Sequence, residues 1–204
     1  IAVTGPTSTS NVTMALNADG GTAALSGSLT VAGTGGIATF TDLSVNLAGT
    51  NYRLAASTAS IAAVSSITFS VGIGAAAAVV LVSGNEQGAL QGEFLSQPLV
   101  VRVRDLGGNP VASGLVTFAV DSGGGFFGDE SDTTQVTADE NGLASVQWHV
   151  GTGQQRVAAI AGTDTLYLRA YVAQRVVLIT EPPSSTQSGV PFTTSPRAQL
   201  MDSA

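Results

Sequence analysis

Apolar and polar residues alternate with a period of two along most of the chain. The alternation is clearest in residues 116–121, 144–150 and 165–172, where Val, Leu, Phe, Trp or Ala fills every second position. A strand with one buried and one solvated face needs this pattern, because successive side chains point to opposite sides of a sheet. A helical pattern is nearly absent, since the Ala run at 75–78 follows two glycines and precedes β-branched residues. We therefore predict an all-β chain.

Turn residues separate the alternating segments. Gly107–Pro110 combines glycines and Asn, which tolerate positive φ, with a Pro that ends strand pairing. Asp139–Gly142 ends in Asn-Gly, the strongest short hairpin signal, so we predict a hairpin turn there. About seven short strands at intervals of roughly 8–12 residues predict a sandwich of two sheets.

Parts of the middle of the chain recur on both sides of it. The matched pairs are Thr13–Leu16 with Thr117–Val120, Gly36–Phe40 with Gly142–Val146, Arg53–Ala56 with Arg156–Ala159, Val79–Val82 with Val176–Ile179, and Val101–Asp105 with Ala198–Asp202. Residues 1–72 thus copy the later strands of a sandwich, and residues 175–204 copy its early strands. We predict one complete sandwich over residues 73–174, flanked by two partial sandwiches that complement each other.

Composition excludes several classes of function. Charged residues make up 10% of the chain, the formal net charge is −7, and the seven cations are scattered arginines. Binding to nucleic acid needs clustered cations, so we expect no nucleic-acid partner. The longest apolar stretch, 73–82, is about half of the roughly 18 residues that a membrane span requires. With neither Cys nor Lys, the chain has no disulfide and no Lys–Asn isopeptide bond. Neither end looks like a signal peptide or a sorting tail, so we expect a mature chain or a segment of a longer one.

A set of short motifs carries a family resemblance. They are Val101-x-Val103-x-Asp105, Gly108-Asn109-Pro110-Val111, Val116-x-Phe118, Gly123-Gly124-Gly125 and Thr137-x-Asp139-x-Asn141-Gly142-x-Ala144-x-Val146-x-Trp148. Through them the middle of the chain resembles a bacterial immunoglobulin-like repeat of the invasin/intimin type. Residues 1–72 resemble a sister variant through Ala38-Thr39-Phe40-x-x-Leu43 and Gly49-x-x-Tyr52-x-Leu54. The resemblance implies tandem immunoglobulin-like β-sandwiches at the bacterial surface, in a stalk, a spacer or an adhesive tip.

We predict no catalytic residues and no enzyme activity. His149 is the single histidine, and its place in the alternation puts it on the solvated face of a strand, next to Trp148 and Val150. We interpret it as a solvated strand histidine. Gly123–Gly125 precedes neither a Lys-Ser/Thr pair nor a helix, so it is not a phosphate-binding loop.

We also expect no metal and no other cofactor. The alternative is a calcium ion held at one end of the sandwich by Asp129, Glu130, Asp132, Asp139 and Glu140. Calcium needs six to eight converging oxygens, and the spacing of these residues matches no calcium motif.

Aromatic residues suggest two structural roles and one binding role. Trp148 falls on the inward face and is predicted to lie in the core, and Tyr52 is predicted to form a tyrosine corner. Tyr167, Arg169 and Tyr171 form an outward stripe and are the candidate binding surface for a host protein or glycan. The alternative is that the stripe reflects ordinary strand propensity on an exposed face.

The complementary flanks lead to an assembly hypothesis. A half-sandwich exposes sheet edges and its core, a state that proteins avoid. We predict that residues 175–204 of one copy complete residues 1–72 of the next, giving a head-to-tail homopolymer or a tandem array. The predicted interface residues are Val176, Val177, Leu178, Ile179, Ala198 and Leu200. The function would be that of an extracellular bacterial fibre or adhesin stalk, whether the chain is a free subunit or part of a longer covalent array. The alternative is a carbohydrate- or protein-binding adhesive module.

Overall fold

The computed structural model describes residues 9–18, 21–59, 61–173 and 175–201. Every regular element in these residues is a β-strand, so the predicted all-β fold class is confirmed. No helix that could cross a membrane occurs in the part of the chain that the structure describes.

Nineteen strands are defined among the described residues, and many of them are short. They are β1 (Asn11–Asn17), β2 (Leu25–Ser26), β3 (Thr30–Ala32), β4 (Ser44–Val45), β5 (Gly49–Thr58), β6 (Ile61–Ser65), β7 (Phe69–Val71), β8 (Ala78–Ser83), β9 (Gln87–Ala89), β10 (Leu99–Arg104), β11 (Leu115–Ser122), β12 (Phe126–Phe127), β13 (Thr133–Thr137), β14 (Leu143–Val146), β15 (Trp148–His149), β16 (Gln155–Ala161), β17 (Asp164–Val172), β18 (Arg175–Thr180) and β19 (Arg197–Met201).

The chain forms two compact units. The first contains the described residues up to 77 together with 104–111, and the second contains 78–103 and the described residues from 112 onward. In the first unit, one sheet has the strand order β3-β1-β5-β6, with β7 also paired to β5, and β2 pairs with β4. The predicted boundaries after residues 72 and 174 stay a prediction, and residue 174 lies outside the described residues.

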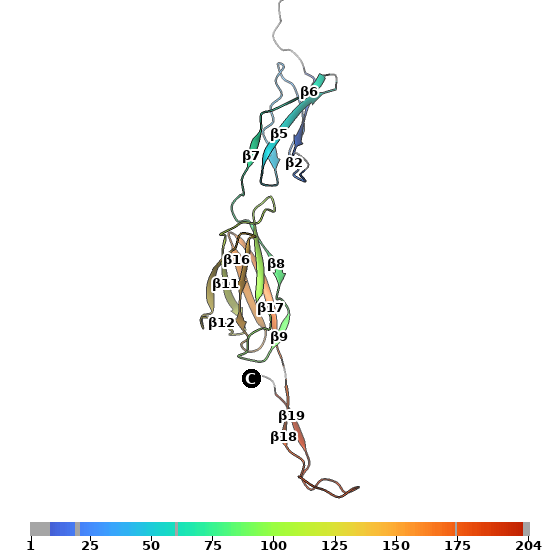
Figure 1. The fold of residues 1–204 in the computed structure, drawn as a ribbon, viewed down its shortest axis with the longest axis vertical. Coiled ribbons are helices and arrows are strands. Elements are labelled where there is room, and N and C mark those ends of the chain that lie inside the picture. The colour runs from blue at the N-terminus through green and yellow to red at the C-terminus, as the bar shows by residue number, and fades with distance from the viewer. Residues whose placement is uncertain (1–8, 19–20, 60, 174, 202–204) are drawn as a thin grey trace, which may run out of the picture. The chain divides into compact units, whose positions relative to one another are not determined.

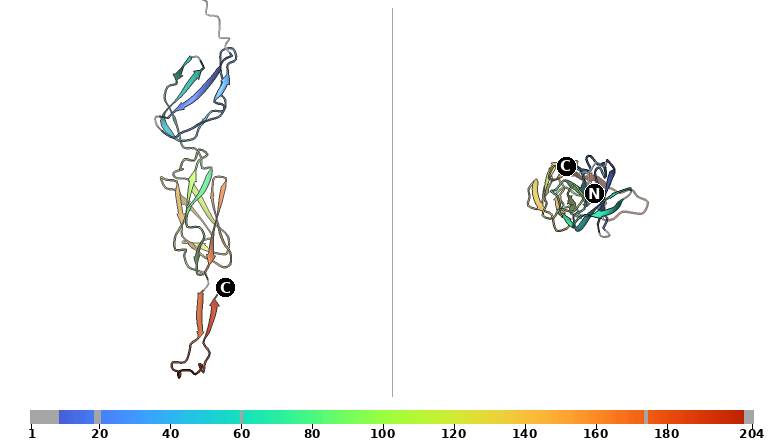
Figure 2. Two further views of the ribbon diagram at one scale, coloured as in Figure 1. Left: turned by 90° about the vertical axis from the view of Figure 1, so that its right-hand side faces the viewer. Right: turned by 90° about the horizontal axis from the view of Figure 1, so that it is seen from above.

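The second unit contains a sandwich with a closed core. One sheet has the order β14-β10-β8 and the other β13-β11-β16-β17-β9, and a short pair, β12-β15, lies beside them (Figures 1 and 2). The fully buried side chains come from both sheets and include Val101, Phe118, Trp148, Val157 and Leu168. The predicted core position of Trp148 is confirmed, because its side chain is 0% exposed.

Two local predictions in this unit are wrong. The alternation at 144–150 is not one strand, because the ladder breaks at Gln147: β14 pairs with β10, whereas β15 pairs with β12. Asp139–Gly142 is a tight turn but no hairpin, since it links β13 and β14, which belong to different sheets. The Asp139 carboxylate accepts hydrogen bonds from the amides of Asn141 and Leu143, so the turn is stabilised locally without pairing of the flanking strands.

The two units share one register. In the first, β1 pairs with β5 so that Thr13 faces Ser57, and in the second, β11 pairs with β16 so that Thr117 faces Ile160. Ser57 and Ile160 each lie four residues after the matched arginine of the repeat (57 − 53 and 160 − 156). The repeated sequences therefore form the same pair of strands, and β1-β5 is the counterpart of β11-β16.

Tyr52 forms the predicted tyrosine corner. Its hydroxyl donates to the carbonyl oxygen of Leu47 at 3.2 Å, and its side chain is buried. Gly49 lies under the ring, because a Cβ at this position would come within 2.5 Å of the hydroxyl oxygen. The Gly49-x-x-Tyr52 spacing thus arises from close packing of the ring on the backbone.

Asp105 is a buried carboxylate with several hydrogen bonds. It accepts from the Gly74 amide at 2.8 Å, from the Asn109 amide at 2.8 Å and from Nδ2 of Asn109 at 2.9 Å. Burial is the largest influence on its pKa and raises it, but the hydrogen bonds from Gly74, Asn109 and Gly107 together outweigh burial. The pKa of Asp105 is therefore lowered below its ordinary value.

The lowered pKa predicts a loss of stability in acid. The hydrogen bonds of Asp105 contribute their full stability above the ordinary aspartate pKa of about 3.9, and this contribution is lost as the pH falls through the lower folded-state pKa. We expect Asp105→Asn to lower the melting temperature at neutral pH, since removing a charged partner costs about 1.5–3 kcal/mol. The difference from wild type should shrink below about pH 4. Melting curves from pH 3 to 7 measure this, and a difference that stays constant with pH would contradict it.

Candidate assembly interface

The apolar side chains of the first unit are less deeply buried than their counterparts in the second unit. Along β1, Val12 and Met14 alternate with exposed residues but are themselves only half-buried. Their counterparts in β11, Val116 and Phe118, are 0% exposed. Among the described residues of 9–72, Tyr52 is the one buried apolar side chain. The sheet that holds β1 and β5 therefore leaves its apolar face more accessible to solvent than its counterpart does.

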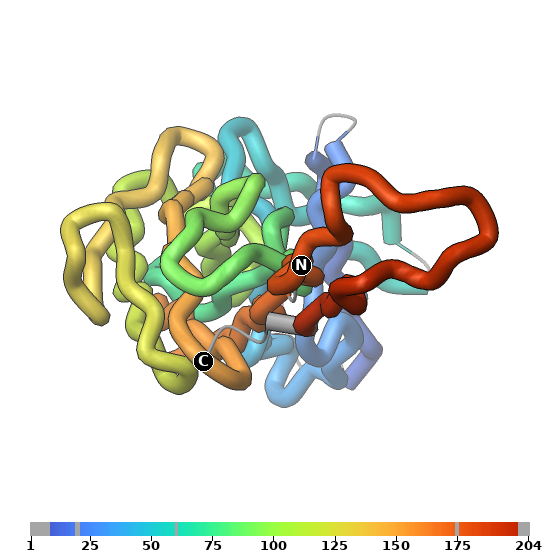
Figure 3. The backbone as a smooth tube through the Cα atoms, turned by 90° about the horizontal axis from the view of Figure 1, so that it is seen from below, coloured from blue at the N-terminus to red at the C-terminus, as the bar shows by residue number. Residues whose placement is uncertain are grey.

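The C-terminal hairpin exposes apolar side chains to solvent. Strands β18 and β19 pair only with each other among the described strands and lie side by side in Figure 1. The wide red loop in Figure 3 is the segment that joins them. Val176 is 70% exposed, and Leu178, Ile179, Val190 and Phe192 are between 45% and 50% exposed. A two-stranded hairpin with this much exposed apolar surface is marginally stable alone in water.

The hairpin is a structural copy of the β8–β10 segment. Residues 175–201 repeat 78–104, each lying 97 positions after its counterpart (176 − 79). Both segments contain a glycine with positive φ at the same place, Gly92 at 78° and Gly189 at 79°. In both, the amide that follows this glycine donates to the carbonyl oxygen three residues before, at 3.0 and 3.1 Å. The copy thus includes the turn between the strands.

The two copies differ in burial. Val79 is 4% exposed and Leu95 is 2% exposed in the second unit, whereas their counterparts Val176 and Phe192 are 70% and 49% exposed. The positions that are buried in the core of the second unit are therefore exposed to solvent in the hairpin. Leaving them there is unfavourable by roughly 1.5–3 kcal/mol for each fully exposed large side chain.

The structure places the six predicted interface residues on this hairpin. Val176, Val177, Leu178 and Ile179 lie on β18, and Ala198 and Leu200 lie on β19. Val176 pairs with Leu200 and Leu178 with Ala198. Asp202, which belongs to the repeat match, lies outside the described residues. Sequence reasoning missed the exposed Val190 and Phe192 in the loop between the strands, although the match of Phe192 to the buried Leu95 indicates them.

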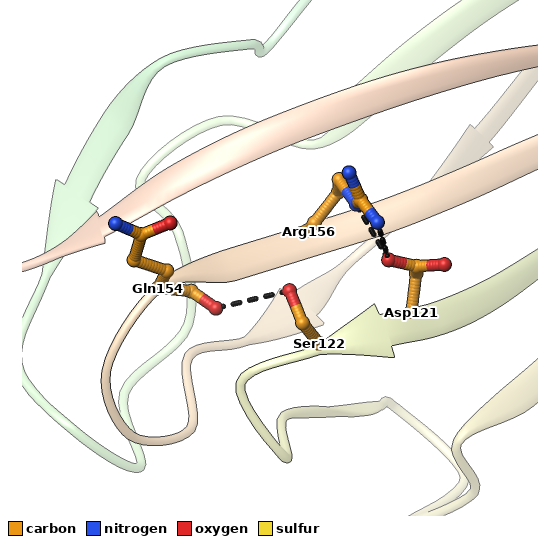
Figure 4. Close-up of polar contacts among 4 residues, drawn as sticks. All are labelled: Asp121, Ser122, Gln154 and Arg156. Atoms are coloured by element: carbon orange, nitrogen blue, oxygen red, sulfur yellow. Dashed lines mark hydrogen bonds and ion pairs between the residues drawn. The ribbon is translucent and has the colours of Figure 1, made fainter.

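The predicted binding stripe lies on the outer face of β17. Tyr167, Arg169 and Tyr171 are all exposed, the two rings by 50% and 55%. The Arg156 guanidinium lies 4.7 Å from the centre of the Tyr167 ring and also pairs with Asp121. Figure 4 shows that ion pair at the end of β11, next to the hydrogen bond from the Ser122 hydroxyl to the Gln154 carbonyl. The structure does not bring the stripe together with the hairpin strands in one sheet. Its role in binding stays a prediction.

The environment predicted for His149 is wrong. The residue is half-buried and its ring stacks on Phe126, with the ring centres 4.3 Å apart, and contacts Phe94. Its Nδ1 is 2.9 Å from the carbonyl oxygen of Gly92. Alternation predicted the correct face of the strand, but the loop that carries Phe94 packs over that face. His149 thus belongs to an aromatic cluster.

Comparison with known proteins gives distant likenesses. No family model and no curated protein matches the chain. The chain is similar to domains 4–9 of the surface layer protein SbsC, with a TM-score of 0.40 and 14% identity over 93% of this chain and 27% of that one. It is similar to SbsC domains 4 and 5 with a TM-score of 0.39 and 14% identity, over 62% of this chain and 66% of that one.

A β-glucuronidase of Parabacteroides merdae is similar with a TM-score of 0.33 and 16% identity, over 80% of this chain and 21% of that one. The chain therefore spans less than two thirds of the length of each of these proteins. At these TM-scores the likenesses assign neither a family nor a function.

Two acidic residues of the calcium alternative, Asp129 and Asp139, hold their own turns through hydrogen bonds. Asp129 accepts from the hydroxyl and amide of Ser131, and these bonds lower the pKa of Asp129, the hydroxyl contributing most. In the first unit, Asp42 accepts from the amide and hydroxyl of Ser28, which likewise lower its pKa, with the amide contributing most. No group of three His, Cys, Asp or Glu residues suited to a metal occurs among the described residues.

Proposed function

We propose that the chain is a structural repeat of a linear array in which the β18–β19 hairpin of one copy completes the first unit of the next. The array would be an extracellular bacterial fibre or adhesin stalk. Whether the copies are separate subunits or repeats of one longer chain, the contact is the same. The observation that carries the proposal is that the hairpin copies β8–β10 while exposing the residues that β8–β10 buries.

The apolar face of the first unit and the exposed face of the hairpin are counterparts of two surfaces that pack together in the second unit. The first unit contains the counterpart of the β11–β16 pair, and the hairpin is the counterpart of the strands that cover this pair in the second unit. Docking would bury Val176 and Phe192 against half-buried residues such as Met14, and each large side chain would contribute about 1.5–3 kcal/mol. It would also pair strand edges that otherwise invite uncontrolled aggregation.

A head-to-tail contact of this kind is heterologous, since the donating and receiving surfaces differ. Such contacts produce open filaments unless the rotation between copies closes a ring. The surface location is supported by the resemblance of residues 101–148 to bacterial surface repeats. A carbohydrate- or protein-binding role is the second proposal, supported by the exposure of Tyr167 and Tyr171 on β17.

The proposal predicts self-association that depends on the β18–β19 hairpin. The 204-residue chain should form concentration-dependent oligomers in sedimentation velocity. Val176→Asp should abolish them, because Val176 is the counterpart of the buried Val79 and an unpaired charge is costly to bury. Leu115→Asp is the control, since Leu115 lies on β11, outside the hairpin, and is 51% exposed, so this variant should still assemble. A wild-type chain that stays monomeric at every concentration would sink the proposal.

A further inference from the structure

The pairing of β8–β10 in the second unit shows how the hairpin could pair with the first unit of a neighbouring copy. There, β10 lies between β8 and β14, with Arg102 opposite Leu143. The segment after β8 crosses to the other sheet, where β9 pairs in parallel with the end of β17, placing Gly88 opposite Tyr171. The β8–β10 segment thus contacts both sheets of its own sandwich.

The counterpart of β14 in the first unit has an unpaired edge. By the repeat match, residues 37–40 correspond to 143–146, and both segments follow a tight turn. In the first unit this turn is closed by two hydrogen bonds between Thr34 and Ile37. Residues 38–40 belong to none of the described strands, and Ile37 is 67% exposed. The segment that holds β10 in one unit is therefore open in the other.

The counterpart of the end of β17 is also open. By the match of Arg53 with Arg156, Tyr52 corresponds to Gln155. Phe69 pairs with Tyr52 and Ala170 pairs with Gln155, so β7 corresponds to residues 170–172. Among the described strands, β7 pairs only with β5. The counterpart of β9 in the tail is Ser184–Thr186, which is exposed and outside any described strand.

We infer that the hairpin pairs with both sheets of the receiving unit, in the register that the β8–β10 segment has in the second unit. In one sheet β19 pairs antiparallel with residues 37–40, placing Gln199 opposite Ile37. In the other, Ser184–Thr186 pairs in parallel with β7, placing Ser185 opposite Ser70. This inference rests on the proposed function and specifies the receiving strands and their alignment.

One difference between the copies concerns the tail segment 184–186, which lacks the side-chain hydrogen bonds that hold β9 in place. In the second unit, Gln87 holds its loop by donating to the carbonyl oxygens of Gly84 and Gln97 and by accepting from the Gln97 amide and the Ser96 hydroxyl. The tail has Ser184 at this position, and its short side chain cannot span these bonds. On docking, residues 184–186 would therefore become a strand through pairing with the receiving unit.

Disulfide cross-linking tests the register, because the chain has no native Cys. Val103 donates to the Gly142 carbonyl, so Arg102 and Leu143 form a non-hydrogen-bonded pair, with Cα atoms about 4.5 Å apart. That distance suits a disulfide. Mixing Ile37→Cys with Gln199→Cys chains under oxidising conditions should yield a dimer that joins one of each. Mixing Ser70→Cys with Ser185→Cys chains should do the same for the second sheet.

Thr39→Cys mixed with Gln199→Cys is the matched control. These residues would be diagonal neighbours about 7–8 Å apart, so no disulfide-linked dimer should form. Sedimentation of the same mixtures separates the two levels of the proposal. If oligomers form but the displaced pair cross-links with the same yield as the predicted pair, the register is wrong and the proposed function still stands. Chains that do not associate overturn the function itself. In the Ile37→Cys/Gln199→Cys double variant, a disulfide within a monomer would show that the receiver is the same copy.

Discussion

Deleting residues 174–204 is expected to abolish self-association completely. The truncated chain keeps the open first unit and the closed second unit but has lost the hairpin that would be donated. Val176 and Phe192 leave with the deletion, and with them the apolar area that would drive docking. Sedimentation velocity should show a monomer at concentrations at which the full chain forms oligomers. Oligomers of the truncated chain would locate the contact elsewhere.

The deletion can be complemented in trans. A synthetic peptide of residues 175–204 should bind the truncated chain and raise the melting temperature of the first unit, because a ligand that binds only the folded state stabilises it. The melting temperature of the second unit should not change, since its core is already closed. The same peptide carrying Val176→Asp is the control and should leave both transitions unchanged. Stabilisation of the second unit by the wild-type peptide would contradict the proposed receiver.

Trp148→Ala should destabilise the second unit by about 3–5 kcal/mol. The indole is 0% exposed, and Gly125 lies so close that a Cβ there would come within 2.5 Å of Nε1. Truncation leaves a large cavity between backbone segments that cannot close over it. A loss of this size is a large part of the 5–15 kcal/mol that typically stabilises a domain.

Far-ultraviolet circular dichroism in urea measures this loss, because the variant lacks the one Trp of the chain. Leu115→Ala is the matched control, since Leu115 lies on β11 but is 51% exposed, and it should cost less than about 1 kcal/mol. If both variants unfold at the same urea concentration, Trp148 does not contribute to the core as described.

Alternation located the strands well but could not assign their partners. The inward residues from Ala144 to Val150 keep their period across Gln147, yet the ladder there passes from β10 to β12. A period of two reports which face is buried and says nothing about which edge is paired. The same limit applies to Asp139–Gly142, whose Asn-Gly turn joins two sheets.

His149 shows a second limit. Its position in the strand placed it on the outer face, which the structure bears out, but Phe94 and Phe126 cover that face. Phe94 lies 55 residues earlier in the chain (149 − 94). Contacts with side chains so far away depend on loop packing, which no local pattern records.

Residue types alone indicate the fold class, the repeat and the match between the tail and the β8–β10 segment, because strand periodicity and internal copies are local patterns in the sequence. The folded structure was needed to show that Val176 and Phe192 are exposed where Val79 and Leu95 are buried. It was also needed to show that residues 38–40 and β7 have open edges. The physical reason is that burial and strand pairing depend on which segments come within reach of one another. Similar patterns therefore end in a fully buried core in one unit and in a half-buried apolar face in the other.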